Sequence, residues 1–211
     1  LEREQSMIVL GRRLFAQSTL SALHRAEWMQ VDVTDTWSCG LQDLVIASYV
    51  LNELPEKKTR EFAERLWQST KGVLVIVEPG TPAGFIRIRE VREHLLSFGA
   101  ATIAPCPHDE PCPLAEDDWC HFSERVSRSR LHRQVKAGEL SYEDEKYSYV
   151  CLSRQRGEGI AGRVLRHPQT RKGCIELDLC TLEGISHKVV TRKDKEGFRR
   201  AKDLKWGSAI R

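Results

Sequence analysis

Three cysteines lie close together in a proline-rich stretch whose residue types and spacing suit metal chemistry. Cys106, Cys112 and Cys120 fall within residues 105–123, PCPHDEPCPLAEDDWCHFS, and prolines flank the first two cysteines on both sides. Because proline fixes its own φ angle and drives the preceding residue toward extended conformations, the pattern predicts a stiff, non-helical segment, here called the cysteine loop. Thiolates are soft ligands, and a set of four favours zinc or an iron–sulfur cluster. The cysteine loop therefore predicts a metal site.

Three thiolates need a fourth ligand, and the sequence leaves its identity open. The intervals between the three cysteines are longer than the short Cys-x-x-Cys spacing of ordinary zinc fingers. The remaining donors are Cys151, Cys174, Cys180 and, for zinc, His108 or His121. Cys151 lies in an apolar run, where a cysteine is typically a small buried residue, and Cys39 has no neighbouring donor pattern, so we set both aside. The alternative to a metal site is a structural loop with unligated thiols.

Basic residues form a second set of functional candidates. The first run contains Arg125, Arg128, Arg130, Arg133 and Lys136 without an intervening acid, and a C-terminal cluster contains Arg192, Lys193, Lys195, Arg199, Arg200 and Lys202. Residues 154–211 hold 15 Lys and Arg against 7 Asp and Glu, a net charge of +8, whereas residues 1–153 hold 18 against 23, a net charge of −5. Such cations neutralise phosphates, which favours RNA as a partner, with Phe198 and Trp206 as candidates for base stacking. The alternative is a solvated basic surface with both aromatic residues in the core.

Strands that alternate with helices are predicted to position these residues. The expected elements are a helix from about residue 3, with Met7, Leu10, Leu14 and Phe15 at helical spacing, strands at 26–33, 43–50 and 72–80, and helices at about 55–70 and 86–98. The apolar face of the last helix is predicted to contain Ile86, Val91, Leu95 and Leu96. This alternation implies an α/β fold with a doubly wound, Rossmann-like parallel sheet, whose ligands bind beyond the carboxyl ends of the strands.

The strand ends select the candidate cofactor-binding residues: Glu2, Asp32, Ser48 with Tyr49, and Glu78 with Pro79. An acid at the end of the second strand can hydrogen-bond a ribose, and an acid after the third can reach the exocyclic amine of an adenine; Glu2 and Asp32 occupy these positions. The glycine-rich loop that cradles a nucleotide belongs upstream of Glu2. We therefore expect an N-terminally truncated sheet that lacks its first strand and this loop.

Short alternating segments after residue 154 predict a second, smaller unit. EKYSYVCLSR at 145–154 is predicted to be the last strand of the sheet, at its edge and antiparallel to its neighbour. GRVLR, CIELDLC and SHKVVTR, separated by Gly and Pro turns, predict a small β module. The chain is thus divided into a sheet domain at 1–154, which contains the cysteine loop at 105–123, and a basic β module at 155–211. A fourth ligand at Cys174 or Cys180 would tie the two together through the metal.

Composition bounds the class of protein. At 211 residues, 40% hydrophobic and 30% charged, the chain can bury the cores of one medium and one small domain. No apolar run approaches the roughly 20 residues of a membrane span, and no signal or transit pattern is present, so we expect an intracellular protein. In that compartment the cysteines favour metal binding over disulfides. The sequence has no nucleophile elbow and no H-E-x-x-H motif, and it predicts no catalytic residue.

Four segments together resemble a known family: ASYVLNELPE at 47–56, VEPGTPAGF at 77–85, APCPHDEPCPL at 104–114 and DWCHFSERVSRSRLHR at 118–133. They look like the small-ribosomal-subunit methyltransferase-like family, which has mitochondrial and bacterial members, and the chain looks closer to the bacterial ones. The resemblance covers essentially the whole chain. It implies an S-adenosylmethionine-dependent methyltransferase fold, association with small-subunit ribosomal RNA during assembly, and a four-iron–four-sulfur cluster held by four cysteines.

The resemblance also implies particular residues. The first three cluster ligands fall on Cys106, Cys112 and Cys120, and the fourth falls within CIELDLCTLEG at 174–184. There Cys180 is favoured because it precedes the turn at 182–184, with Cys174 as the alternative, and Glu2 matches the acid that ends the second strand.

The expected protein is a monomeric ribosome assembly factor without membrane contact, in a bacterial cytoplasm or, for a eukaryotic source, the mitochondrial matrix. The alternatives are an active S-adenosylmethionine-dependent rRNA methyltransferase and a zinc-binding, RNA-binding protein without enzymatic activity.

Overall fold

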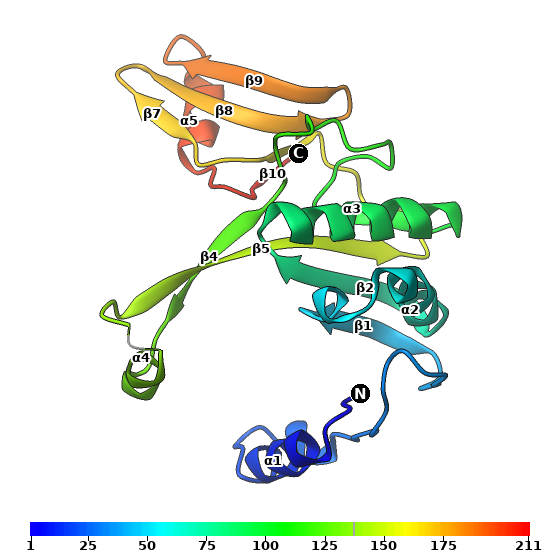
Figure 1. The fold of residues 1–211 in the computed structure, drawn as a ribbon. Helices are drawn as coiled ribbons and strands as arrows, with labels where there is room; N and C mark the ends of the chain where they lie inside the picture. Colours follow the sequence, from blue (N-terminus) through cyan, green and yellow to red (C-terminus); the bar gives the residue numbers. More distant parts are fainter. Residues whose placement is uncertain (137) are drawn as a thin grey trace.

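Two β-sheets organise the computed structural model of the protein, which describes residues 1–136 and 138–211 (Figure 1). The first part of the chain contains α1 (Gln5–Ala16), η1 (Leu23–Arg25), β1 (Gln42–Ser48), η2 (Leu51–Glu53), α2 (Glu56–Gln68), β2 (Thr70–Pro79), α3 (Pro82–Ser97), β3 (Ala101–Ala104), β4 (Phe122–Ser127), α4 (Arg130–Val135) and β5 (Tyr142–Ser153). The second part contains β6 (Gly162–Val164), β7 (Gln169–Arg171), β8 (Cys174–Thr181), β9 (Gly184–Thr191), α5 (Lys195–Lys202) and β10 (Ala209–Ile210). The chain therefore has a mixed α/β fold.

The first sheet has the strand order β1-β2-β5-β3, with β4 paired to the outer part of β5. β1 and β2 are parallel, as β-branched apolar runs predict, and β5 is antiparallel to β2, β3 and β4. The predicted place of the last strand at the sheet edge is wrong, because β5 lies between β2 and β3. Segment 101–104, which carried no clear strand pattern, supplies the outer partner. β5 is thus central, and both of its ends contact the elements around the cysteine loop.

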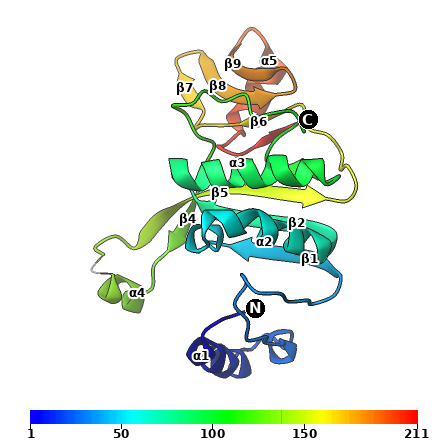
Figure 2. The same ribbon diagram turned by 45° about the vertical axis from the view of Figure 1, so that its right-hand side comes forward.

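Helices cover one face of this sheet. α2 and α3 pack on each other and on Leu74 and Ile76 of β2 and Leu152 of β5, which are all fully buried (Figure 2). On the opposite face Leu44 and Ile46 of β1 are 55% and 60% exposed. A doubly wound sheet carries helices on both faces. Among the described residues, helices cover only one face of this sheet, so the predicted doubly wound arrangement is seen in part. No helix among the described residues is long and apolar enough to cross a membrane.

The N-terminal segment departs most from the sequence prediction. α1 forms as expected, but it lies apart from the sheet and its predicted apolar residues Met7, Leu10 and Leu14 are exposed (Figure 1). The predicted strand at 26–33 is reduced to one parallel bridge between Glu2 and Gln30. A β-strand is stabilised by a ladder of hydrogen bonds, and here only Glu2 lies alongside to accept and donate them. The strand prediction for 26–33 is therefore wrong for the described chain.

α3 positions one wall of the candidate site. It begins at Pro82, four residues earlier than predicted, because Thr81 caps it by accepting a hydrogen bond from the Gly84 backbone N–H (3.1 Å) and proline suits the first turn. The predicted apolar face is partly wrong: Ile86 is exposed, and the buried residues are Gly84, Phe85, Ile88, Val91, Arg92 and Leu95. Arg92 is thus a charged residue on a buried helix face.

β4 and β5 continue beyond the sheet as a two-stranded arm, defined here as residues 123–146, which carries α4 near its tip (Figures 1 and 2). The register runs from Phe122 opposite Tyr147 to Ser127 opposite Tyr142. Ser129 caps α4 by accepting a hydrogen bond from the His132 backbone N–H (3.1 Å). The arm therefore displays the first basic run away from the body of the protein.

The second sheet, with α5 packed against it, forms what we call the C-terminal module, residues 162–211. Its strand order is β10-β6-β8-β7 with β9 paired to β8, and every pairing is antiparallel. The three segments predicted as strands correspond to β6, β8 and β9, whereas α5 was not predicted. The core of the module contains Val164, Ile175, Leu177, Leu179, Val190 and Ala201. β8 is the central strand, and it carries Cys180 near its end.

The one-sided cover of the first sheet predicts unequal effects of two leucine truncations. In the 211-residue chain, Leu74→Ala should lower the free energy of unfolding by about 2–5 kcal/mol, because it leaves a cavity under α2 and α3. Leu44→Ala, on the neighbouring strand but on the exposed face, should change it by less than about 0.5 kcal/mol. Urea denaturation measures both. Equal losses would contradict the one-sided arrangement.

Candidate metal centre

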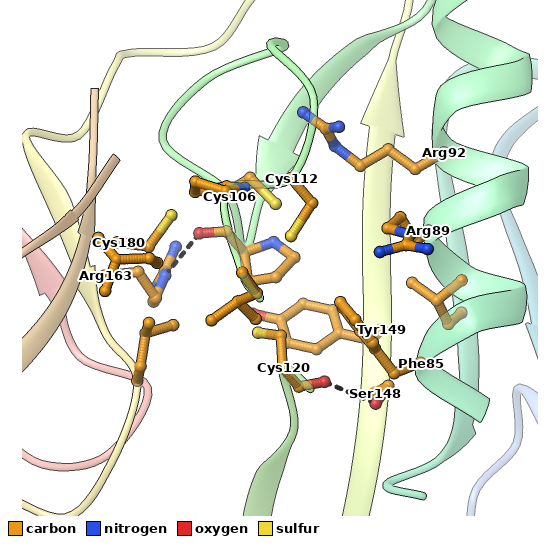
Figure 3. A pocket seen from close by; sticks show the side chains of 16 residues that line it. Phe85, Arg89, Arg92, Cys106, Cys112, Cys120, Ser148, Tyr149, Arg163 and Cys180 are labelled. Carbon is orange, nitrogen blue, oxygen red and sulfur yellow. Dashed lines mark hydrogen bonds between the residues drawn. The ribbon is translucent and has the colours of Figure 1, made fainter. Parts of the chain in front are cut away.

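Four thiols line a single cavity between α3, the cysteine loop, β5 and the C-terminal module (Figure 3). They belong to Cys106, Cys112 and Cys120 of the cysteine loop and to Cys180 of β8. The cavity contains about 590 Å³ of space free of protein atoms, part of it open to solvent. All seven cysteines lie within the described residues and are free thiols. The structure thus brings together the three cysteines of the loop and one cysteine from the far end of the chain.

The other candidate ligands lie elsewhere or at the margin. Cys174 begins β8 and Cys180 comes near its end, and only Cys180 lines the cavity. His121 packs between Trp119 and Trp206, with ring centroids 5.3 and 4.9 Å away, and does not line the cavity. His108 lies outside the lining but its Nε2 is 3.7 Å from the Cys180 Sγ. Among the described residues, no group of three or more His, Cys, Asp or Glu is arranged to hold a single metal ion.

Hydrogen bonds from the sheet domain fix the cysteine loop at several points. The Thr102 backbone N–H donates to the Asp109 carboxylate (2.8 Å), and the Ser148 hydroxyl of β5 donates to the Cys120 carbonyl (2.7 Å). The Trp119 indole N–H donates to the Gly80 carbonyl at the end of β2 (3.0 Å). The loop contains no helix or strand between residues 105 and 121, as its prolines predict. These side-chain contacts therefore replace regular secondary structure in positioning the thiols.

Polar contacts hold the C-terminal module against the loop. Arg163 of β6, which is opposite Cys180 in the β6–β8 pairing, donates from Nε to the Pro105 carbonyl (2.8 Å) and from Nη1 to the Gly207 carbonyl (2.9 Å). Arg166 forms an ion pair with Asp118. The junction between loop and module is therefore made largely of arginine side chains and backbone carbonyls around the thiols.

Burial and repulsion between neighbouring thiolates favour the protonated forms of Cys106, Cys120 and Cys180 in the metal-free protein, because both effects raise the pKa of a thiol. Burial raises the pKa of Cys106, Cys120 and Cys180, in the last case to about 12. For Cys120 the neighbouring thiolates of Cys106, Cys112 and Cys180 raise the pKa further, and for Cys180 those of Cys106 and Cys112 do so. Four thiolates can coexist here only if a bound cation offsets their charge. The donor set therefore fits a thiolate-bound metal or cluster.

Two arginines oppose this repulsion. Arg92 from α3 and Arg163 from β6 line the cavity, and both lower the pKa of Cys106 and of Cys180. Arg92 is 4% exposed, and its Nε and Nη1 have no hydrogen-bond partner within the described residues. Sequence reasoning missed both residues. The helical spacing of Arg92 relative to the apolar residues Ile88, Val91 and Leu95 could have indicated a charged residue on the buried face of α3. No comparable pattern in the sequence pointed to Arg163.

The predicted cofactor residues are only partly gathered. Glu2 and Asp32 line one pocket with Val50, Glu53 and Leu54, whereas Ser48 and Tyr49 are not among its lining residues. The Glu2 carboxylate accepts from the Glu4 backbone N–H (2.8 Å). Asp32 accepts from the backbone N–H (2.9 Å) and hydroxyl (2.7 Å) of Thr34, which lower the pKa of Asp32. Both carboxylates thus have local donors, and the second oxygen of Asp32 lies 3.8 Å from the Arg3 guanidinium.

The segment after β1 has unusual backbone geometry. Tyr49 has a φ of 58°, in the left-handed region, and its hydroxyl donates to the Glu145 carboxylate (3.2 Å). Glu78 at the end of β2 is fully buried, which raises its pKa, and it accepts from the Leu51 backbone N–H (2.8 Å). Glu78 therefore positions the loop that follows β1, and Ser48 lies exposed at the strand end.

The predicted RNA-binding cations fall on two separate surfaces. On the arm, Arg125 forms a two-pronged ion pair with Asp144 (2.7 and 2.9 Å), and Arg128 pairs with Glu143 (2.7 Å). Arg130, Arg133 and Lys136 lie on or directly after α4 near the tip. The second group, on the C-terminal module around α5, contains Arg192, Lys193, Lys195, Arg199, Arg200 and Lys202. Lys136 Nζ lies 4.0 Å from the Glu143 carboxylate, whereas no ion pair of Arg130 or Arg133 of α4 is found among the described residues.

Both predicted stacking residues are half-buried and in contact with other side chains. Phe198 packs against the core of the C-terminal module, which is the alternative considered from the sequence. The Trp206 ring packs edge-on to His121 and His167, with centroids 4.9 and 4.8 Å away, and is not part of that core.

A mixed α/β domain joined to a β module around four thiols defines the class of protein. The whole chain, residues 1–211, matches the model of the family described as mitochondrial small ribosomal subunit Rsm22. The chain therefore belongs to the Rsm22 family, which confirms the resemblance drawn from the cysteine loop and its neighbouring segments. This membership supports a methyltransferase-like fold.

Curated relatives agree with the family. The human ribosome assembly protein METTL17, mitochondrial, is 30% identical over 187 residues, which cover 80% of this chain and 39% of that protein. The Schizosaccharomyces pombe Rsm22-cox11 tandem proteins 1 and 2, mitochondrial, are 26% identical over 212 residues, which cover 78% of this chain and 28% of each of those proteins. The chain thus spans well under half the length of these relatives.

Proposed function

We propose that this protein assists assembly of the small ribosomal subunit by binding small-subunit rRNA, and that Cys106, Cys112, Cys120 and Cys180 hold a four-iron–four-sulfur cluster. The observation that carries this proposal is the single cavity lined by four thiols from two parts of the chain. Family membership and the assembly role in the name of the human relative support the ribosomal context. The protein acts as a monomer, in the mitochondrial matrix or, for a bacterial source, the cytoplasm.

The cluster would act as a structural connector. When bound, it supplies iron–thiolate bonds that join the cysteine loop to β8 and offset the repulsion among the thiolates. Arg92 and Arg163, one from each side of the cavity, balance the remaining negative charge. In this proposal the site holds the cysteine loop and the C-terminal module together.

The arm would supply much of the RNA contact. Arg130, Arg133 and Lys136 lie near its tip, away from the body of the protein, where phosphates can approach from several directions (Figure 1). The cations around α5 form a second surface. Two separated basic surfaces suit a partner longer than a short oligonucleotide, such as a folded ribosomal RNA.

A second candidate function is methyl transfer from S-adenosylmethionine to rRNA. The pocket that contains Glu2 and Asp32 favours it, because carboxylates can accept hydrogen bonds from the hydroxyls of a ribose and the amine of an adenine. Calorimetric titration of the protein with S-adenosylmethionine tests this candidate. Absence of binding would exclude the enzyme.

Cysteine substitutions should identify the ligands. The anaerobically purified protein should contain about four iron ions and about four sulfide ions per chain, and it should show a broad absorption band at about 400 nm. Each of the single substitutions Cys106→Ser, Cys112→Ser, Cys120→Ser and Cys180→Ser should abolish most of the bound iron and of the visible absorption, since each deletes one of the thiols that line the cavity. Cys174→Ser and Cys151→Ser are matched controls and should keep the cluster, because neither thiol lines the cavity.

Two results would contradict the proposed cluster. One zinc ion per chain without visible absorption would replace it with a zinc site. Loss of iron from Cys174→Ser together with retention in Cys180→Ser would overturn the ligand set while leaving a cluster in place.

Charge removal at the arm tip should weaken RNA binding. We compare wild type with the triple variant Arg130→Gln, Arg133→Gln, Lys136→Gln. For binding to small-subunit rRNA, the slope of log affinity against log salt concentration should be smaller in magnitude by about 2–3 in the variant, since up to three phosphate contacts are lost. A triple variant with Gln at Lys57, Lys58 and Arg60 of α2 removes the same charge elsewhere and should leave this slope nearly unchanged. Equal slopes for the two variants would place the RNA contact away from the arm.

A further inference from the structure

Arg92 is a buried cation without a matching anion. It lies on α3, it is 4% exposed, and no salt bridge found among the described residues involves it. It shares its helix face with Ile88, Val91 and Leu95, where burial of an unpaired charge is costly. A guanidinium in this position is stable only if a negative group lies opposite it, and the cavity that it lines offers only the thiols for that role.

Its hydrogen bonds account for one of its three nitrogens. Nη2 donates to the carbonyls of His108 (2.6 Å) and Glu110 (3.1 Å), which both lie in the cysteine loop between Cys106 and Cys112. Nε and Nη1 are buried and have no partner within the described residues. Buried donors of this kind are rare in proteins, because a donor that has left water without finding a partner is destabilising. Two unmet donors on one guanidinium point to an acceptor that binds in the cavity.

Arg163 on the other side of the cavity differs. Its Nε and Nη1 donate to the carbonyls of Pro105 (2.8 Å) and Gly207 (2.9 Å), so these donors are already used to hold the junction. Figure 3 shows Arg92 on the α3 side of the cavity and Arg163 near Cys180 on the opposite side, with Cys106 and Cys112 between them in this view. Of the arginines that line the cavity, Arg92 is the one whose unpaired donors are buried, within the described part of the chain.

We propose that Arg92 donates N–H···S hydrogen bonds from Nε and Nη1 to sulfur atoms of the bound iron–sulfur cluster or its cysteine ligands, and so raises the cluster's reduction potential. This inference rests on the proposed cluster. Reduction adds one electron, supplied by an external reductant such as dithionite, and makes the cluster more negative by one charge. Hydrogen bonds and a nearby cation stabilise that more negative state, so they favour reduction. Arg92 is thus a positioning residue that raises the reduction potential of the cluster, and its Nη2 also holds the cysteine loop in place.

The test is a redox titration, followed by electron paramagnetic resonance, of anaerobically purified wild type and three variants. Arg92→Gln should lower the reduction potential of the bound cluster. Arg92→Lys keeps the charge but loses the planar donor pair, so its potential should lie between those of Arg92→Gln and wild type. Arg89→Gln, on the same helix and at the same cavity, is the matched control and should shift the potential less, because Arg89 is more exposed and screened. A purely structural role for Arg92 would reduce the amount of cluster bound without moving its potential.

The outcomes separate the two proposals. A wild-type chain without iron and sulfide overturns the cluster and the role of Arg92 together. A wild-type chain with a cluster whose potential is unchanged in Arg92→Gln overturns the role of Arg92 alone. If Arg92→Gln does not retain the cluster, Arg92→Lys decides the question: a lower potential than wild type supports the proposal, and an equal potential contradicts it.

Discussion

The structure depends on one electrostatic constraint, which is that four neighbouring thiols in one cavity cannot all lose their protons side by side unless a cation joins them. Cys120 illustrates it, because burial and the three neighbouring thiols all raise its pKa. A bound cation would relieve the repulsion that makes the metal-free cavity unfavourable for thiolates. Because Cys180 comes from β8 and the other three come from the cysteine loop, relief of this repulsion also joins two sheets.

The elements around the cavity serve this junction. β5 is central in its sheet and holds the Cys120 carbonyl through Ser148, while α3 holds the loop through Arg92. From the other side, Arg163 holds the Pro105 carbonyl. Proline stiffness limits how far the loop can rearrange, so a few side-chain contacts suffice where no regular secondary structure exists. The arm and α5, which carry the basic surfaces, are thereby placed on a connected framework.

Much of this was predictable from local patterns in the sequence. Apolar β-branched runs gave β1 and β2, and the proline framing of Cys106 and Cys112 gave a non-helical loop. The position of β5 inside the sheet was not predictable, because strand order depends on pairings between distant segments. The segment 26–33 has a strand-like pattern but lacks a ladder of partners, and Trp206 is fixed by His121 and His167, which are far from it in sequence. Arg92 carried a signal in its helical position, but its meaning required the cavity.

The connection between the two parts of the chain is the central claim, and limited proteolysis with and without the metal tests it most directly. Residues 154–161 join the two sheets, and they contain Arg154 and Arg156 as trypsin sites. The account predicts that removal of the metal with a chelator speeds cleavage in this segment and within residues 162–211, while cleavage around α2 is unchanged. Equal protection of residues 162–211 in the metal-bound and metal-free protein would contradict it, even if the four cysteines proved to be the ligands.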